Sequence, residues 1–130
     1  MRVLGIQNNN CNTTFKAGNI MLEGIEPKEF QDLQSYKDIK YITETDELDL
    51  TITKNEDKNA SHFMICSQKE APNSAKVIRG ASCVDIARGS SPQDVSYILY
   101  QKVIRSVERL ALRMQEATGQ RTEFLKYLKR

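Results

Sequence analysis

The sequence of 130 residues contains no tryptophan, one histidine, three prolines and three cysteines. Aromatic residues make up 7% of the chain, which leaves little material for a surface that stacks on nucleic-acid bases. No apolar run approaches the roughly 18 consecutive residues that cross a bilayer, and the apolar stretch in residues 1–7 is too short for a secretory signal. These absences favour a cytoplasmic protein that does not bind membranes.

Recognisable catalytic and metal-binding patterns are also lacking. Cys11, Cys66 and Cys83 are odd in number and far apart, so they indicate free thiols rather than a disulfide scaffold. None belongs to a C-x-x-C pair, which argues against zinc, and the acidic residues match no calcium loop. His62 lies in a predicted strand, where a structural histidine is more common than a general base. The sequence therefore predicts a non-catalytic protein without a metal or a cofactor.

The net charge of +2 hides an asymmetry along the chain. Residues 1–70 carry 8 Lys and Arg against 12 Asp and Glu, whereas residues 71–130 carry 11 against 5. This polarity suggests either an anionic partner for the C-terminal part or head-to-tail complementarity between copies. A nucleic-acid polymer is a poor partner, because the acidic half would repel it and affinity for polyanions depends on many phosphate contacts.

Residues 1–88 have the pattern of short strands and turns, with one short helix starting at Pro27. Alternating apolar and polar side chains indicate a strand at 47–53, which we expect to form a hairpin with residues 39–43. Gly80 is a candidate bulge within a strand at 76–87. Further strands are predicted at residues 1–7, 19–25 and 62–66. The short connections between these segments favour a mostly antiparallel sheet.

The C-terminal part, residues 91–130, has the pattern of helices. Ser91, Pro92 and Asp94 form a strong helix start, and Gly119 supplies a stop, so a long amphipathic helix is predicted up to residue 118. A short terminal helix should follow at 121–129. Strands followed by helices indicate an α+β fold, and the length fits a single domain over residues 1–130.

The long helix has two contrasting faces. Its broad apolar stripe is most simply a core-facing surface, and consists of Leu99, Tyr100, Val103, Ile104, Val107, Leu110, Ala111 and Met114. A second line repeats every four residues and consists of Gln101, Arg105, Arg109 and Arg113. This line is either a solvated face or an interface. Arginine suits bidentate contact with phosphate or carboxylate, and Ile98 and Leu112 project among the charges, which favours an interface with a ligand or a subunit.

The loop before this helix offers a second candidate site for an anion. Arg88, Gly89, Ser90 and Ser91 precede the helix N-terminus, where unpaired N–H groups and the helix dipole favour negative charge. Gly89 permits a close approach of the backbone, and the serines add hydroxyl donors. Ser91 is equally well explained as the helix cap alone.

The order of these elements, together with the arginine line and the polar segment 89–91, resembles that of the Thoeris anti-defence sponges. These phage proteins sequester cyclic nucleotide signals made by bacterial immune enzymes. The resemblance covers the whole chain and implies sequestration, without cleavage, of cyclic ADP-ribose isomers or cyclic oligonucleotides. It also implies a homo-oligomer, a dimer or larger, with pockets at subunit junctions. Tyr97 and Phe63 are then the nearest candidates for stacking on a base.

The main alternative is a protein-binding module, such as an immunity protein that neutralises a bacterial toxin. In that case the acidic half of the chain would contact a basic partner, and exposed acids such as Asp46, Glu47 and Asp49 would carry the interaction. An enzyme whose site has no sequence signature is a further alternative.

Overall fold

A computed structural model describes residues 18–72 and 74–119. The predicted strand at 1–7, Cys11 and the predicted helix at 121–129 lie outside the described residues. Four strands form one sheet in the order β1-β2-β3-β4. The elements in chain order are β1 (Ile20–Glu23), α1 (Pro27–Gln31), α2 (Tyr36–Thr45), β2 (Asp49–Glu56), β3 (Ala60–Glu70), β4 (Val77–Ala87) and α3 (Pro92–Thr118). The α+β class predicted from the sequence is therefore confirmed.

The predicted hairpin at residues 39–53 is half wrong. Residues 39–43 lie in helix α2, which buries Ile39, Ile42 and Thr43 at helical spacing, while the second arm does form β2. Consequently β1 pairs with β2 in parallel, with Ile20 opposite Leu50, because α1 and α2 provide the crossover that parallel strands require. The β2–β3 and β3–β4 pairs are antiparallel, as predicted.

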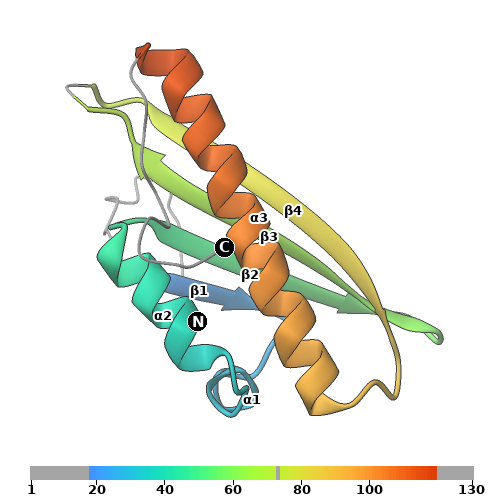
Figure 1. Ribbon diagram of the computed structural model, residues 1–130. Helices are drawn as coiled ribbons and strands as arrows, with labels where there is room; N and C mark the ends of the chain where they lie inside the picture. The colour runs from blue at the N-terminus through green and yellow to red at the C-terminus, as the bar shows by residue number, and fades with distance from the viewer. Residues whose placement is uncertain (1–17, 73, 120–130) are drawn as a thin grey trace.

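Both long helices cover the same face of the sheet (Figure 1), with α2 in front of β1 and β2, and α3 in front of β3 and β4. Strand β2 turns Leu50 and Ile52 toward the helices, and β3 turns Phe63 and Ile65 the same way. No element among residues 18–72 and 74–119 covers the opposite face of the sheet, and Met64 on that face is 56% exposed. None of the described helices is long and apolar enough to cross a membrane.

Helix α3 begins and ends where the sequence predicts. The Ser91 hydroxyl accepts the N–H of Asp94, Pro92 occupies the first turn, and Gly119 ends the helix in the left-handed conformation. The apolar stripe packs on the sheet, with Leu99, Val103, Val107, Leu110 and Met114 fully or almost fully buried.

Gly80 is not a bulge, because the pairing of β4 with β3 runs through it without interruption. A Cβ built on Gly80 would lie 2.3 Å from both Leu110 N and Ser106 O of α3. Glycine is therefore needed here because the backbones of the helix and the strand approach each other too closely for a side chain. This contact sets how α3 lies over β4.

A buried polar contact joins the two long helices. Ser35, just before α2, donates its N–H to the Ser96 hydroxyl at 2.8 Å and its hydroxyl to the Ser96 carbonyl at 3.0 Å. Buried polar groups that form hydrogen bonds with one another fix the relative position of the two helices without leaving a buried donor or acceptor unpaired. The contact therefore holds the start of α2 against the first turns of α3.

Candidate functional site

The arginine line of α3 does not form a uniform solvated face. Arg105 is exposed and forms an ion pair with Glu108 at 3.9 Å, one turn away on the same helix. Arg109 instead reaches the sheet and donates from Nη1 to the main-chain oxygen of Ala81 in β4 at 2.7 Å. Gln101 is exposed. Arg109 is exposed, and its side chain lies at the flank where α3 meets β4.

Arg113 borders an open groove between the last turns of α3 and the start of β4. The groove has a volume of about 590 Å³ and is lined by Lys76, Val77, Ile78, Arg79, Arg113, Glu116 and Ala117. Three of these side chains are cationic and one is acidic, so the groove carries an excess of positive charge. Val77, Ile78 and Ala117 supply apolar surface. We call this set of seven residues the α3/β4 groove.

Two of the three cations in the α3/β4 groove were not singled out from the sequence. Lys76 and Arg79 come shortly before Gly80 in the chain, at the start of β4. Only the packing of α3 on β4 brings them beside Arg113. Arg79 is exposed and held in place by Gln68 of β3, whose Oε1 accepts from its Nε at 3.1 Å. No local sequence pattern predicts this grouping, because residues 76–79 and residue 113 are far apart along the chain.

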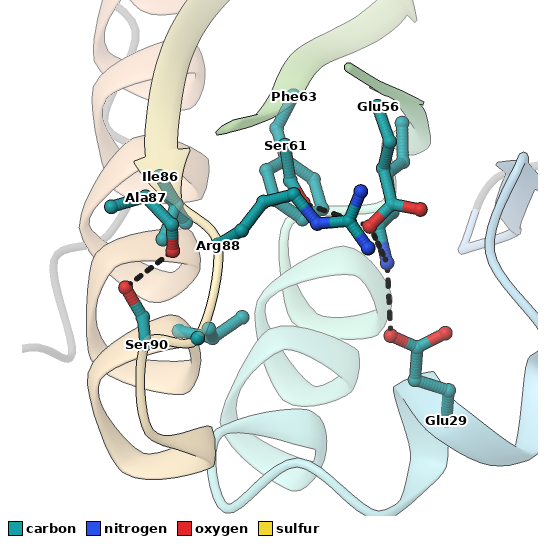
Figure 2. Close-up of a pocket in the computed structure, with 11 residues that line it drawn as sticks. Glu29, Glu56, Ser61, Phe63, Ile86, Ala87, Arg88 and Ser90 are labelled. Atoms are coloured by element: carbon teal, nitrogen blue, oxygen red, sulfur yellow. Dashed lines mark hydrogen bonds and ion pairs between the residues drawn. The ribbon is translucent and has the colours of Figure 1, made fainter. Parts of the chain in front are cut away.

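The loop predicted to bind anions, residues 88–91, lies at the opposite end of β4. Arg88, Gly89 and Ser90 line a cavity of about 200 Å³ whose other walls include Phe63, Ile86 and Val95. Figure 2 shows the Arg88 side chain extending past Ser61 toward Glu56. Arg88 also donates from Nη1 to the main-chain oxygen of Asp57 at 3.0 Å.

The charges of this cavity are matched internally. Lys54 lies 3.2 Å from Glu29 and 3.5 Å from Glu56, so its ammonium group bridges two carboxylates. A hydrogen bond from Ser61 and the charge of Lys54 lower the pKa of Glu56, which favours its charged form. The loop hydroxyls are also engaged: Ser90 donates to the Ala87 carbonyl at 2.6 Å, and Ser91 caps the helix. The cavity therefore has less excess charge to offer an anion than the α3/β4 groove.

His62 is a bridging residue, in agreement with the structural role expected from its position in a strand. Its Nε2 lies 2.7 Å from an Asp57 oxygen and its Nδ1 lies 2.7 Å from an Asp85 oxygen. Hydrogen bonds that His62 donates to the carboxylates of Asp85 and Asp57 raise the pKa of His62, and the bond from His62 helps lower the pKa of Asp57 to about 2. The imidazolium form can donate from both ring nitrogens, so this arrangement braces the β2–β3 turn against β4.

The remaining residues named from the sequence are dispersed. Phe63, a candidate for base stacking, is only 4% exposed and packs in the core, whereas Tyr97 is 66% exposed near the start of α3. Burial raises the pKa of the Cys66 thiol. Within residues 18–72 and 74–119, no group of three or more His, Cys, Asp or Glu side chains could hold a metal ion.

The acidic residues expected to contact a toxin also make contacts within the chain. Asp49 is buried and accepts the N–H of Asn19 at 3.1 Å, so it stabilises the start of β1 instead of facing a partner. Asp46 and Glu47 both accept a hydrogen bond from Lys69 Nζ through their main-chain oxygens at 2.9 Å.

Comparison with protein families, curated proteins and solved structures finds no match to this chain.

Proposed function

We propose that this protein is a non-catalytic binding protein that sequesters an anionic small molecule, of the cyclic nucleotide class, in the α3/β4 groove. The observation that supports the proposal is the gathering of Lys76, Arg79 and Arg113 around one groove whose described lining includes a single acid, Glu116. Arginine pairs well with phosphate oxygens, often through two parallel hydrogen bonds.

The dimensions of the groove suit a nucleotide better than a single inorganic ion. Ligand pockets commonly have volumes of about 300–1,000 Å³, and the groove volume of about 590 Å³ falls within this range. Val77, Ile78 and Ala117 offer apolar surface to a ribose or a base, while Lys76 and Arg113 would meet phosphates. Sequestration of such a molecule in the cytoplasm would withhold a bacterial immune signal and so block anti-phage defence.

The first test is calorimetric titration with a panel of cyclic nucleotides that includes cyclic ADP-ribose isomers, followed by chromatography of the released ligand. Sequestration predicts tight binding and recovery of the ligand unchanged. Recovery of a cleaved product would instead show an enzyme, and the absence of binding by every member of the panel would contradict the proposal.

Matched variants locate the site. Arg113→Gln and Lys76→Gln should each weaken binding by about tenfold or more, because each removes a charge-assisted contact with a phosphate. Arg105→Gln is the control, since it removes an arginine from the same helix face but lies outside the α3/β4 groove. An equal loss of affinity in all three variants would indicate a general charge effect and argue against a specific site in the groove.

A further inference from the structure

Strand β4 is a long strand at the edge of the sheet, and one of its two sides has no neighbouring strand among the described residues. It spans 11 residues and contains neither proline nor lysine; its charged residues are Arg79 and Asp85, and Arg109 of α3 reaches the carbonyl of its Ala81. In Figure 1, β4 runs along the outside of the sheet while α3 lies over its face.

The main-chain hydrogen bonds show which residues of β4 face outward. Lys76 O accepts Ala71 N at 2.9 Å and Arg88 N donates to Asn59 O at 3.0 Å, so even-numbered positions at both ends of β4 turn toward β3. The main-chain N–H and C=O groups of successive residues point to opposite sides of an antiparallel strand. The odd-numbered residues of β4 therefore turn these groups outward, away from β3. The bond from Arg109 to Ala81 O, an odd position, agrees with this assignment.

The sequence of β4 is nearly symmetrical about its central residue, Ser82. The strand carries two charges, Arg79 and Asp85, each three residues from Ser82 and of opposite sign. Ile78 and Ile86 stand at equal distances from the centre, as do the small residues Ala81 and Cys83. An antiparallel copy of β4 centred on Ser82 would therefore place every arginine opposite an aspartate and leave no overhang.

We infer that two copies of this chain pair through their β4 edges, antiparallel and about a two-fold axis at Ser82, to form one continuous sheet of two subunits. Arg79 would then face Asp85 of the partner subunit, and the symmetry would repeat this pair on the other side of the axis. Both side chains are exposed, on the face of the sheet that no described helix covers. His62 contacts one oxygen of Asp85, and a carboxylate has a second oxygen that can accept from arginine.

Other registers are less favourable on the same grounds. Moving the axis by one residue along β4, which keeps outward-facing positions opposite one another, separates Arg79 from Asp85 and leaves both charges unmatched. Opposite-charge pairs across strands stabilise a sheet, and like charges destabilise it. On pairing, the N–H of the partner subunit's Cys83 would replace Arg109 at Ala81 O, so the carbonyl keeps a donor.

The same register bears on the α3/β4 groove, and this part rests on the proposed function. It places Lys76 opposite Arg88 of the partner subunit, just beyond the ends of the two strands. Arg88 extends toward Glu56 and donates to the Asp57 carbonyl of its own subunit, so the charge that an anion would neutralise here is that of Lys76. An anion bound in the groove would therefore strengthen the dimer, because whatever binds one state preferentially shifts the equilibrium toward it.

The test is sedimentation equilibrium of the full chain, with the fold of each variant checked by circular dichroism. Arg79→Asp and Asp85→Arg should each weaken dimerisation by about tenfold or more, since each reversal places two like-charge pairs across the axis. The double variant, which exchanges the charges, should restore the wild-type dissociation constant. Restoration is the decisive result, because a general loss of fold would not be repaired by the second substitution. A general effect of net charge would shift the two single variants in opposite directions, since one loses two positive charges and the other gains two.

A wild-type chain that stays monomeric at all concentrations would overturn the pairing, and so would a dimer that tolerates both single reversals. Addition of sodium pyrophosphate at constant ionic strength separates the two proposals. Stronger dimerisation with pyrophosphate supports the link to the groove. A charge-dependent dimer that ignores pyrophosphate would leave the pairing standing and count against anion binding in the groove.

Discussion

The close approach of α3 to β4 at Gly80 makes the effect of one methyl group predictable. A Cβ at position 80 would lie 2.3 Å from two backbone atoms of α3, whereas ordinary contacts of a Cβ are 3.4 Å or longer. Neither atom belongs to a flexible side chain that could turn away. Gly80→Ala therefore has to push the helix away from the strand by about 1 Å, which separates packed atoms along the interface.

The expected cost of Gly80→Ala is about 3 kcal/mol in the free energy of unfolding, the upper part of the range for overpacking of a core. The interface that opens is the one that buries Val107, Leu110 and Met114. Without the clash, alanine would stabilise a strand by about 0.5–1 kcal/mol relative to glycine, so even the sign of the change is informative.

Urea denaturation followed by circular dichroism measures this change. With a slope near 1.5 kcal/mol/M, the midpoint should fall by about 2 M. Gly119→Ala is the matched control, because it adds the same atom where nothing lies within 4 Å, at a backbone angle φ of +73°. The control should cost only about 1–2 kcal/mol from left-handed strain. A Gly80→Ala variant no less stable than this control would refute the close approach of α3 to β4.

Three further predictions use the same denaturation assay. Leu110→Ala should cost about 2–5 kcal/mol, because Leu110 is fully buried, and a silent change would mean that the orientation of α3 is wrong. Ser91→Ala should cost about 1 kcal/mol through loss of the helix cap, and Ser91→Asp should restore it. Because the pKa of His62 is raised by folding, its contribution to stability is present below about pH 6.5 and is lost as the pH rises through the pKa of the folded state. Asp57 has a pKa of about 2 in the folded state, so its contribution to stability is lost as the pH falls below about 4. His62→Gln should therefore flatten the decline in stability above pH 6.5, and an unchanged pH profile would contradict the bridge between the two aspartates.

The features predicted correctly from the sequence are those fixed by local signals. Helix α3 has a capping serine, a proline in its first turn and a terminal glycine, each of which acts within a few residues. Strands β2 and β4 show the alternation of a sheet with one buried face. Residues 39–43 were assigned to a strand because a short apolar run fits either element, although Ile39, Ile42 and Thr43 have the spacing of a helix.

The features that were missed depend on contacts between distant segments. The parallel pairing of β1 with β2 follows from the crossover through α2, and a strand prediction for residues 39–43 excludes that crossover. The α3/β4 groove depends on the packing of α3 across Gly80, which brings Arg113 beside Lys76 and Arg79. The line of arginines can be seen in the sequence, but the different contacts of its members cannot. Arg105 pairs with Glu108, Arg109 reaches the edge of β4, and Arg113 borders the groove.

Binding in the α3/β4 groove is the central claim, and residue-by-residue mapping of the ligand tests it most directly. Amide chemical shifts of the labelled protein would be followed during titration with a cyclic ADP-ribose isomer. The largest changes are predicted at residues 76–79 and 113–117, with small changes around residues 88–90. Changes centred on residues 88–90, or no change at saturating ligand, would contradict the account.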